Sequence, residues 1–149
     1  MYTFSERNCF DDSPEEREAF FEKLWQDGGF RYWLGNYKDY LFSKEANQEV
    51  YDFWVKKQKV RIDDERKRNI LVPDKMPHYW GIKRPCLEYA YFEQFNRPTV
   101  DVVDIKNNGI KSFDETGINL QDGTHYDFDV ICIATGFDVV TGEWTDALL

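Results

Sequence analysis

The chain has 149 residues, which is long enough for one domain with a hydrophobic core of its own. Its formal net charge of -9 argues against nucleic acid or an anionic membrane surface as a partner, because the protein's own field would repel both. No apolar run is long enough to span a membrane and the N-terminus lacks a signal-peptide core, so we expect an intracellular, cytoplasmic protein.

Cysteine spacing and charge patterning give no sign of a metal site or a basic interface. The three cysteines, Cys9, Cys86 and Cys132, lie far apart without the paired spacing of a zinc site or a redox pair, so we expect reduced thiols and no bound metal. The charged run from Lys56 to Arg68 mixes both signs and is interpreted as a solvated helix surface. Aromatic residues make up 17% of the chain, and some of them are candidates to cover an interface with another domain or a second copy.

The first half of the chain shows helical signals in order. Ser13 is a helix cap, Pro14 occupies the first helical position, and Glu16 can close a capping box. The helix that they predict ends at Gly28-Gly29. Its aromatic face is interpreted as core packing rather than as a ligand site, and consists of Phe20, Phe21, Leu24 and Trp25.

Three further helices are expected before residue 80. Residues 30–42 predict a fragmentary helix and a turn, and Ser43 can cap a longer helix with an apolar stripe that includes Val50 and Phe53. Residues 63–71 predict one more short helix, and the prolines of residues 72–78 indicate a loop. We therefore expect a helical region over residues 1–79.

The stretch from Trp80 to Val100 carries the most distinctive chemistry. Gly81 gives backbone freedom, and Pro85 pushes Arg84 toward an extended conformation, so Lys83 and Arg84 are expected on a fixed bend. Behind the bend, apolar residues at helical spacing predict a short helix that packs by one face; they are Leu87, Ala90, Tyr91 and Phe95.

After Pro98 the pattern changes to that of strands. Strands are expected over residues 100–105, 110–113, 117–120 and 126–133, with a hairpin turn at Gln121-Asp122-Gly123. Residues 130–134 are apolar at nearly every position, which is typical of a strand covered on both faces. The predicted fold class is α+β, a helical N-terminal half followed by a small mixed β-sheet. Residues 1–79 and 80–149 are the two expected regions of one structural domain.

Two motifs resemble those of the Baeyer-Villiger monooxygenases, FAD- and NADPH-dependent enzymes that insert oxygen beside a ketone. One is the run G-x-KRP-x-L-x-x-x-Y-x-x-FNRP-x-V, and the other is DVICIATGFDVVTG further along. The stretch SPEEREAFFEKLWQDGGFRY also resembles the helical insertion of that family. The resemblance implies part of the NADPH-binding domain of a flavoprotein with two dinucleotide domains, and a ketone substrate for the whole enzyme.

The resemblance also implies roles for individual residues. Arg84 matches the catalytic arginine, which stabilises the negative charge that develops during oxygen transfer. Lys83 matches the lysine that approaches the ribose phosphate of NADPH. The turn Ala134-Thr135-Gly136 matches the segment between the two dinucleotide domains, so its backbone would face the flavin. For Phe137 and Asp138, the end of a strand with no binding role is an equally reasonable interpretation.

The sequence departs from the family in ways that bear on activity. It contains no GxG, although each dinucleotide needs a glycine-rich turn at a helix start, and it lacks the fingerprint FxGxxxHxxxW. We therefore expect an internal slice of a monooxygenase that binds neither FAD nor NADPH alone and is inactive alone. Two alternatives remain: a non-catalytic module for dimerisation or for association with flavoprotein domains, and a cofactor-free enzyme that reuses the pocket at Lys83 and Arg84.

Three other residues with reactive side chains are given passive roles. Cys86 lies beside two cations, which can lower the pKa of a thiol, but no histidine lies close in sequence to act as its base. We expect it to pack. His78 and His125 are interpreted as a loop residue and a turn residue rather than as ligands.

Overall fold

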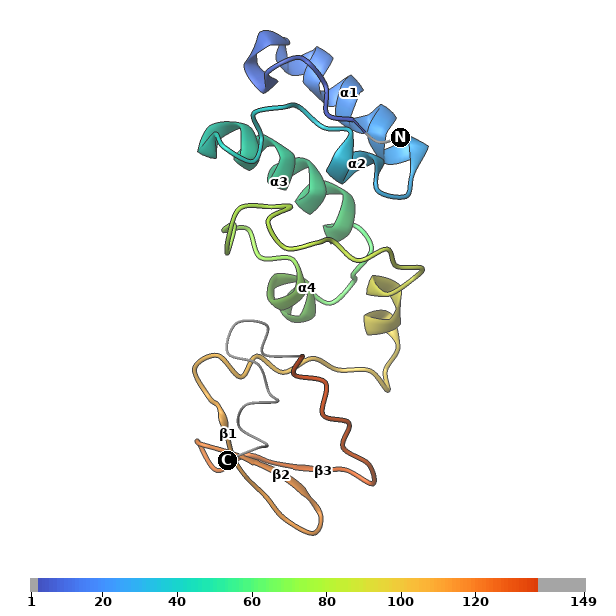
Figure 1. The fold of residues 1–149 in the computed structure, drawn as a ribbon. Coiled ribbons are helices and arrows are strands. Elements are labelled where there is room, and N and C mark those ends of the chain that lie inside the picture. The colour runs from blue at the N-terminus through green and yellow to red at the C-terminus, as the bar shows by residue number, and fades with distance from the viewer. Residues whose placement is uncertain (1–2, 137–149) are drawn as a thin grey trace. The chain divides into compact units, whose positions relative to one another are not determined.

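Helices come first along the chain and strands come last (Figure 1). The structure is a computed structural model that describes residues 3–136. This order confirms the α+β fold class. The chain divides into two compact units, Met1–Val103 and Asp104–Leu149. None of the described helices is long and apolar enough to cross a membrane.

The first long helix, α1 (Pro14–Asp27), follows a 3-10 helix η1 (Cys9–Asp11) and begins as the sequence predicts. The Ser13 hydroxyl accepts a hydrogen bond from the backbone N–H of Glu16 at 3.3 Å, and the Glu16 carboxylate accepts one from Ser13 N at 2.8 Å. Gly28 has a φ of +69°, a conformation that favours glycine, and ends the helix.

The next three helices follow caps or short turns. Helix α2 (Arg31–Leu34) is a single turn, and α3 (Lys44–Lys59) begins where Ser43 accepts from the backbone N–H of Ala46 at 3.2 Å. Helix α4 (Glu65–Leu71) begins where Asp64 accepts from Lys67 N at 2.8 Å. The predicted succession of helices is confirmed.

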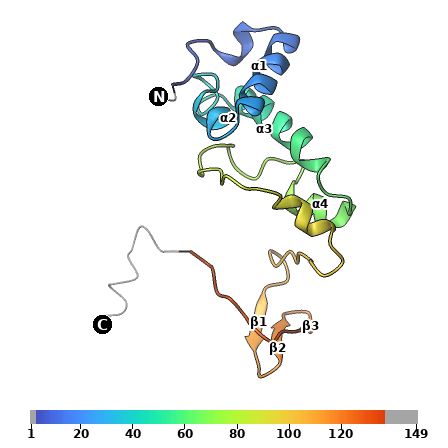
Figure 2. The same ribbon diagram turned by 90° about the vertical axis from the view of Figure 1, so that its right-hand side faces the viewer.

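The core of the first unit is mainly aromatic, and α1 packs against both α2 and α3 (Figure 1, Figure 2). The rings of Tyr32 and Phe53 stack with centroids 5.4 Å apart, and Phe21 meets Tyr32 edge-on at 5.9 Å. Phe20 and Trp25 are partly buried and pack against this cluster. The interpretation of this helix face as core packing is confirmed for Phe20 and Phe21, while Leu24 and Trp25 also line a pocket.

The helix predicted from Leu87 to Phe95 is wrong. Ala90 has a φ of +55°, which interrupts a right-handed helix, and only the 3-10 helix η2 (Phe92–Asn96) forms. Leu87 is 60% exposed, whereas Phe92 is buried and packs with Ile62. The apolar spacing therefore predicted the wrong buried residue.

The second unit contains the strands β1 (Ile110–Phe113), β2 (Gly117–Leu120) and β3 (His125–Asp127). We expected a mixed sheet; both strand pairs among the described residues are antiparallel, in the order β1-β2-β3. The hairpin at Gln121-Asp122-Gly123 is confirmed: Leu120 N donates to Thr124 O at 2.8 Å, and Gly123 has a φ of +90°.

The strand predicted over residues 100–105 does not form, and the one predicted over residues 126–133 is limited to β3, which ends at Asp127. Residues 100–105 and 130–134 have no strand structure, and the side chains of Val130 and Ile133 are 82% and 67% exposed. A strand with two apolar faces needs a neighbouring strand and a covering layer on each face. The described part of the second unit supplies neither to residues 130–134.

Candidate functional site

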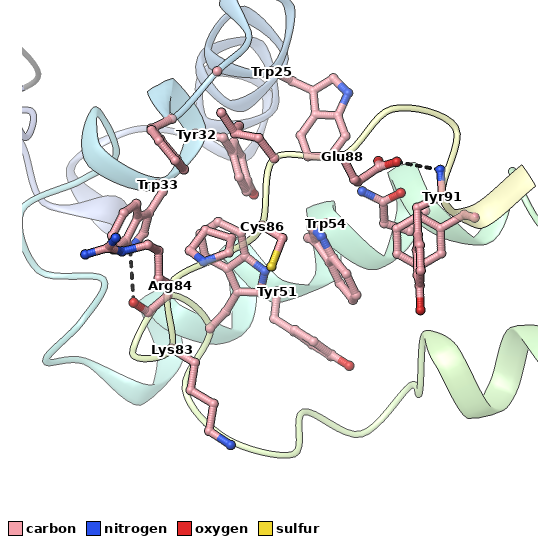
Figure 3. A pocket seen from close by; sticks show the side chains of 18 of the residues that line it. Trp25, Tyr32, Trp33, Tyr51, Trp54, Lys83, Arg84, Cys86, Glu88 and Tyr91 are labelled. Atoms are coloured by element: carbon pink, nitrogen blue, oxygen red, sulfur yellow. Dashed lines mark hydrogen bonds between the residues drawn. The ribbon is translucent and has the colours of Figure 1, made fainter. Parts of the chain in front are cut away.

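Lys83 and Arg84 lie on an exposed segment, residues 82–87, that is termed the cationic strap. Both side chains are exposed, and neither makes an ion pair or hydrogen bond with another residue in the range 3–136. Both line a pocket with a volume of about 980 Å³, whose other walls are largely aromatic. Figure 3 shows the Lys83 side chain extending away from these aromatic residues. The two cations are therefore free to meet an anionic ligand at the pocket rim.

The N-terminal end of the cationic strap is fixed by hydrogen bonds from the helical core. Asn47 on α3 bonds to both backbone groups of Trp80, and the indole N–H of Trp33 donates to the carbonyl of Gly81 at 3.0 Å (Figure 3). Gly81 has a φ of +87°, and a Cβ there would lie 2.7 Å from the hydroxyl of Tyr40. Only glycine fits this close approach.

The C-terminal end of the cationic strap is fixed by an ion pair. Arg61, just after α3, binds the carboxylate of Glu88 through Nη1 at 2.6 Å and Nη2 at 3.2 Å. The same carboxylate accepts a hydrogen bond from the backbone N–H of Tyr91 at 2.8 Å (Figure 3). The cationic strap is thus held at both ends and unsupported between them.

The pocket beside the cationic strap presents an apolar wall. Its lining includes Trp25 and Trp54, together with Tyr32 and Tyr51, whose hydroxyls are engaged elsewhere. Tyr32 donates to Val50 O at 2.7 Å, and Tyr51 donates to Pro73 O at 2.5 Å. Burial raises the pKa of Tyr51 to about 12, so this hydroxyl stays neutral. The wall suits the apolar or aromatic part of a ligand, while the cationic strap would bind its negatively charged part.

Cys86 and the two histidines take part in this arrangement differently. Cys86 is exposed and lines the pocket, so it does not pack as we expected, and His78 lines the same pocket from the preceding loop. His125 lies in the second unit, 3.3 Å from a carboxylate oxygen of Asp114. No group of three metal-ligating side chains occurs in the described part of the chain.

The turn expected to face the flavin lies in the second unit. Ala134, Thr135 and Gly136 are exposed, and Gly136 has a φ of +90°. Lys83 and Arg84 lie in the first unit. Phe137 and Asp138 lie outside the described residues.

The described residues fit one part of a dinucleotide better than another. The free ammonium of Lys83 at a pocket rim is suited to a phosphate group. A pyrophosphate usually binds open backbone amides at a helix start. Here one first-turn amide at the start of each of the helices α1, α3 and α4 bonds to a capping side chain, that of Ser13, Ser43 or Asp64. The chain therefore offers cations for a phosphate, whereas its sequence contains no glycine-rich GxG turn to bind a pyrophosphate.

Sequence reasoning missed the residues that hold the strap. Asn47 carries no sequence signal, because an asparagine inside a helical stripe usually faces solvent. Arg61 lies within the charged run interpreted as a solvated surface, yet its side chain is only 22% exposed. The alternation of arginine with acidic residues does not indicate which arginine side chain is bound by carboxylates from another part of the chain.

Comparison with known proteins finds relatives across almost the whole chain. No protein-family model matches it. It is 50% identical to the FAD-binding monooxygenase acrE of Aspergillus aculeatus, over 96% of this chain and 24% of that protein. It is 44% identical to cyclopentanone 1,2-monooxygenase of Comamonas sp., over 97% of this chain and 26% of that enzyme. The chain thus spans about a quarter of the length of these relatives.

Solved structures agree with the sequence matches. A crystal structure of OTEMO in complex with FAD and NADP superposes with a TM-score of 0.89 at 40% identity, over 97% of this chain and 26% of that one. A structure of cyclohexanone monooxygenase bound to epsilon-caprolactone gives a TM-score of 0.82 at 33% identity, over 95% of this chain and 27% of that one. The chain is therefore homologous, over nearly its whole length, to a segment of the FAD-binding Baeyer-Villiger monooxygenases.

Proposed function

We propose that this chain forms part of an FAD- and NADPH-dependent monooxygenase that inserts oxygen beside a ketone, and that it is inactive without the remaining parts of such an enzyme. The observation that carries the proposal is the pair Lys83 and Arg84, exposed and unpaired within residues 3–136 at the rim of an aromatic pocket. Two neighbouring cations without carboxylate partners create a local positive potential that attracts an anionic ligand.

The two cations suit different anionic groups. A guanidinium stays charged at all accessible pH values and offers a planar fork of N–H donors, so Arg84 would stabilise negative charge that develops on the oxygen beside the ketone carbon. The ammonium of Lys83 is a compact charge that would bind the ribose phosphate of NADPH. When bound, NADPH supplies the reducing equivalents and FAD carries them to oxygen.

The turn Ala134-Thr135-Gly136, in the second unit, is a separate element of the proposal. Small side chains and a φ of +90° at Gly136 allow a flat ring to approach the backbone closely. In this proposal the turn faces the flavin, and the pyrophosphates of FAD and NADPH bind elsewhere in the enzyme.

A test on the purified chain addresses the claim of inactivity. We expect the chain to be colourless as isolated, to retain no FAD after gel filtration, and to leave NADPH unoxidised when cyclopentanone and FAD are added. The physical reason is that the sequence contains no GxG, the glycine-rich turn at which the pyrophosphate of a dinucleotide approaches the backbone amides of a helix start. Turnover of NADPH that depends on the ketone would overturn the claim.

A second candidate function is an association module, favoured by apolar side chains on the second unit. Phe113, Phe128, Val130 and Ile133 are each about half exposed or more. A module that dimerises through them would be a stable dimer in sedimentation whether or not FAD and NADPH are present. A monomer at all concentrations would exclude dimerisation.

A further inference from the structure

We propose that Arg61 is a positioning residue for Lys83 and Arg84, because it fixes the C-terminal end of the cationic strap. The consequence for catalysis rests on the proposed function of those two cations. The positioning itself concerns only contacts within the first unit, and it is tested without any cofactor.

Arg61 binds two carboxylates with one guanidinium. It meets Glu93 through Nε at 2.6 Å and Nη2 at 2.7 Å, and it meets Glu88 through Nη1 at 2.6 Å and Nη2 at 3.2 Å. Each carboxylate is therefore held by two N–H groups. Such forked pairs fix orientation as well as distance, which a lysine cannot do.

The backbone and the side chain of Arg61 are themselves held by neighbouring residues. Its backbone carbonyl accepts from the side chain of Asn96 at 3.0 Å, and its Nη1 donates to the buried Gln58 at 2.7 Å. The guanidinium also lies over the ring of Phe92, 5.1 Å from the centroid. The guanidinium therefore joins the end of α3 to the segment that follows the strap.

The strap depends on this contact because it has little other support. Residues 83–87 make no hydrogen bond with any other described residue, so their order depends on the two ends. Glu88 follows the strap directly, and its carboxylate binds both Arg61 and the backbone N–H of Tyr91. Loss of Arg61 would leave Glu88 and Glu93 as repelling like charges at one end of the strap.

Arg61 also keeps the strap's cations available. Glu88 is the acidic residue nearest to Arg84 in sequence, and Glu93 is the next. Hydrogen bonds from Arg61 lower the pKa of both glutamates, so both are charged at neutral pH. Engaged by Arg61, they do not pair with Lys83 or Arg84. Without Arg61, these carboxylates would be free to neutralise the proposed site.

Hydrogen exchange on the purified full-length chain tests this proposal directly. In Arg61→Gln we expect the amides of Tyr91 and Gln94, whose N–H groups bond to the Glu88 carboxylate and to the Tyr91 carbonyl, to exchange faster by about fivefold or more, while the buried amides of α3 keep their protection. Arg66→Gln is the matched control, since Arg66 on the neighbouring helix α4 binds Asp101 and the carbonyl of Val102 and does not contact the strap. Selective acceleration in the first variant supports positioning.

Two further variants separate positioning from a general loss of structure. Glu93→Gln removes the charge of one carboxylate that Arg61 binds. Arg61→Lys keeps the positive charge but lacks the planar set of N–H donors. Both variants should give an intermediate acceleration of exchange in the same residues. Unchanged exchange in Arg61→Gln, or an equal rise in α3, would overturn the proposal. The exchange experiment uses no cofactor, so its result does not depend on the proposed function. If the proposed function is wrong, substitution of Lys83 and Arg84 leaves the activity unaltered.

Discussion

The side-chain amide of Asn47 hydrogen-bonds to both backbone groups of Trp80: its Oδ1 accepts from the N–H at 2.7 Å, and its Nδ2 donates to the carbonyl at 3.0 Å. The same Nδ2 donates to the carbonyl of Tyr40 at 2.9 Å. Asn47 is fully buried. One side chain on α3 therefore fixes the place where the chain enters the cationic strap.

Asn47→Ala should lower the free energy of unfolding by about 2 to 4 kcal/mol, because it leaves part-buried backbone groups without partners. Urea unfolding followed by tryptophan fluorescence measures the change. Gln48→Ala is the control: its side chain bonds only to Asp52 on the surface of the same helix, and about 0.5 kcal/mol or less is expected. An equal decrease in the free energy of unfolding in the two variants would show that the hydrogen bonds to Trp80 do not stabilise the fold.

Gly81→Ala should destabilise the first unit more than Gly28→Ala does. Both glycines have positive φ, so an alanine costs about 1 to 2 kcal/mol of backbone strain at either position. A Cβ at Gly28 meets nothing within 4 Å, whereas one at Gly81 would lie 2.7 Å from the Tyr40 hydroxyl and 3.2 Å from Trp33. We expect about 1 to 3 kcal/mol beyond the strain term at Gly81, measured by urea unfolding. Similar losses at both sites would mean that the close approach relaxes without cost.

The stabilisation from Arg61 should disappear in acid. Arg61 lowers the pKa of Glu88 and of Glu93 below the 4.5 of an ordinary glutamate, so the folded state binds these protons less readily than the unfolded state. The stabilisation is complete above pH 4.5 and is lost as the pH falls through the lowered values. The gap in free energy of unfolding between the wild type and Arg61→Gln should therefore shrink as the pH falls below about 4.5. A constant gap would assign the effect of Arg61 to packing on Phe92.

Local signals in the sequence were enough to predict the helices and the hairpin. Ser13 and Ser43 cap helices through their own side chains, and Gln121-Asp122-Gly123 closes a turn by backbone geometry, so each depends only on near neighbours. Lys83 and Arg84 were found from a motif rather than from any physical rule. Their exposure and lack of partners among the described residues agree with a binding role, which remains a proposal.

The parts that failed depend on distant partners. Ala90 adopts a positive φ although its neighbours are spaced for a helix, and Glu88 and Phe92 on either side of it are held by Arg61 and Ile62, far earlier in the chain. The predicted strand over residues 130–134 needs neighbours that the described residues do not supply. Contacts between residues far apart in the sequence produce no local sequence pattern. The spacing of apolar residues therefore could not predict the interruption at Ala90 or the lack of a strand over residues 130–134.

The central claim, that Lys83 and Arg84 serve an FAD- and NADPH-dependent monooxygenase, is tested most directly in a chimaera. This chain would replace the matching quarter of cyclopentanone 1,2-monooxygenase, to which it is 44% identical, and oxidation of NADPH with cyclopentanone would be measured. We expect an active chimaera, in which Arg84→Ala lowers kcat by about 100-fold or more and Lys83→Ala mainly raises the KM for NADPH by about tenfold. Lys75→Ala, at another exposed lysine, is the control and should change neither. An active chimaera that keeps its full rate and NADPH affinity without Arg84 and Lys83 would contradict the account.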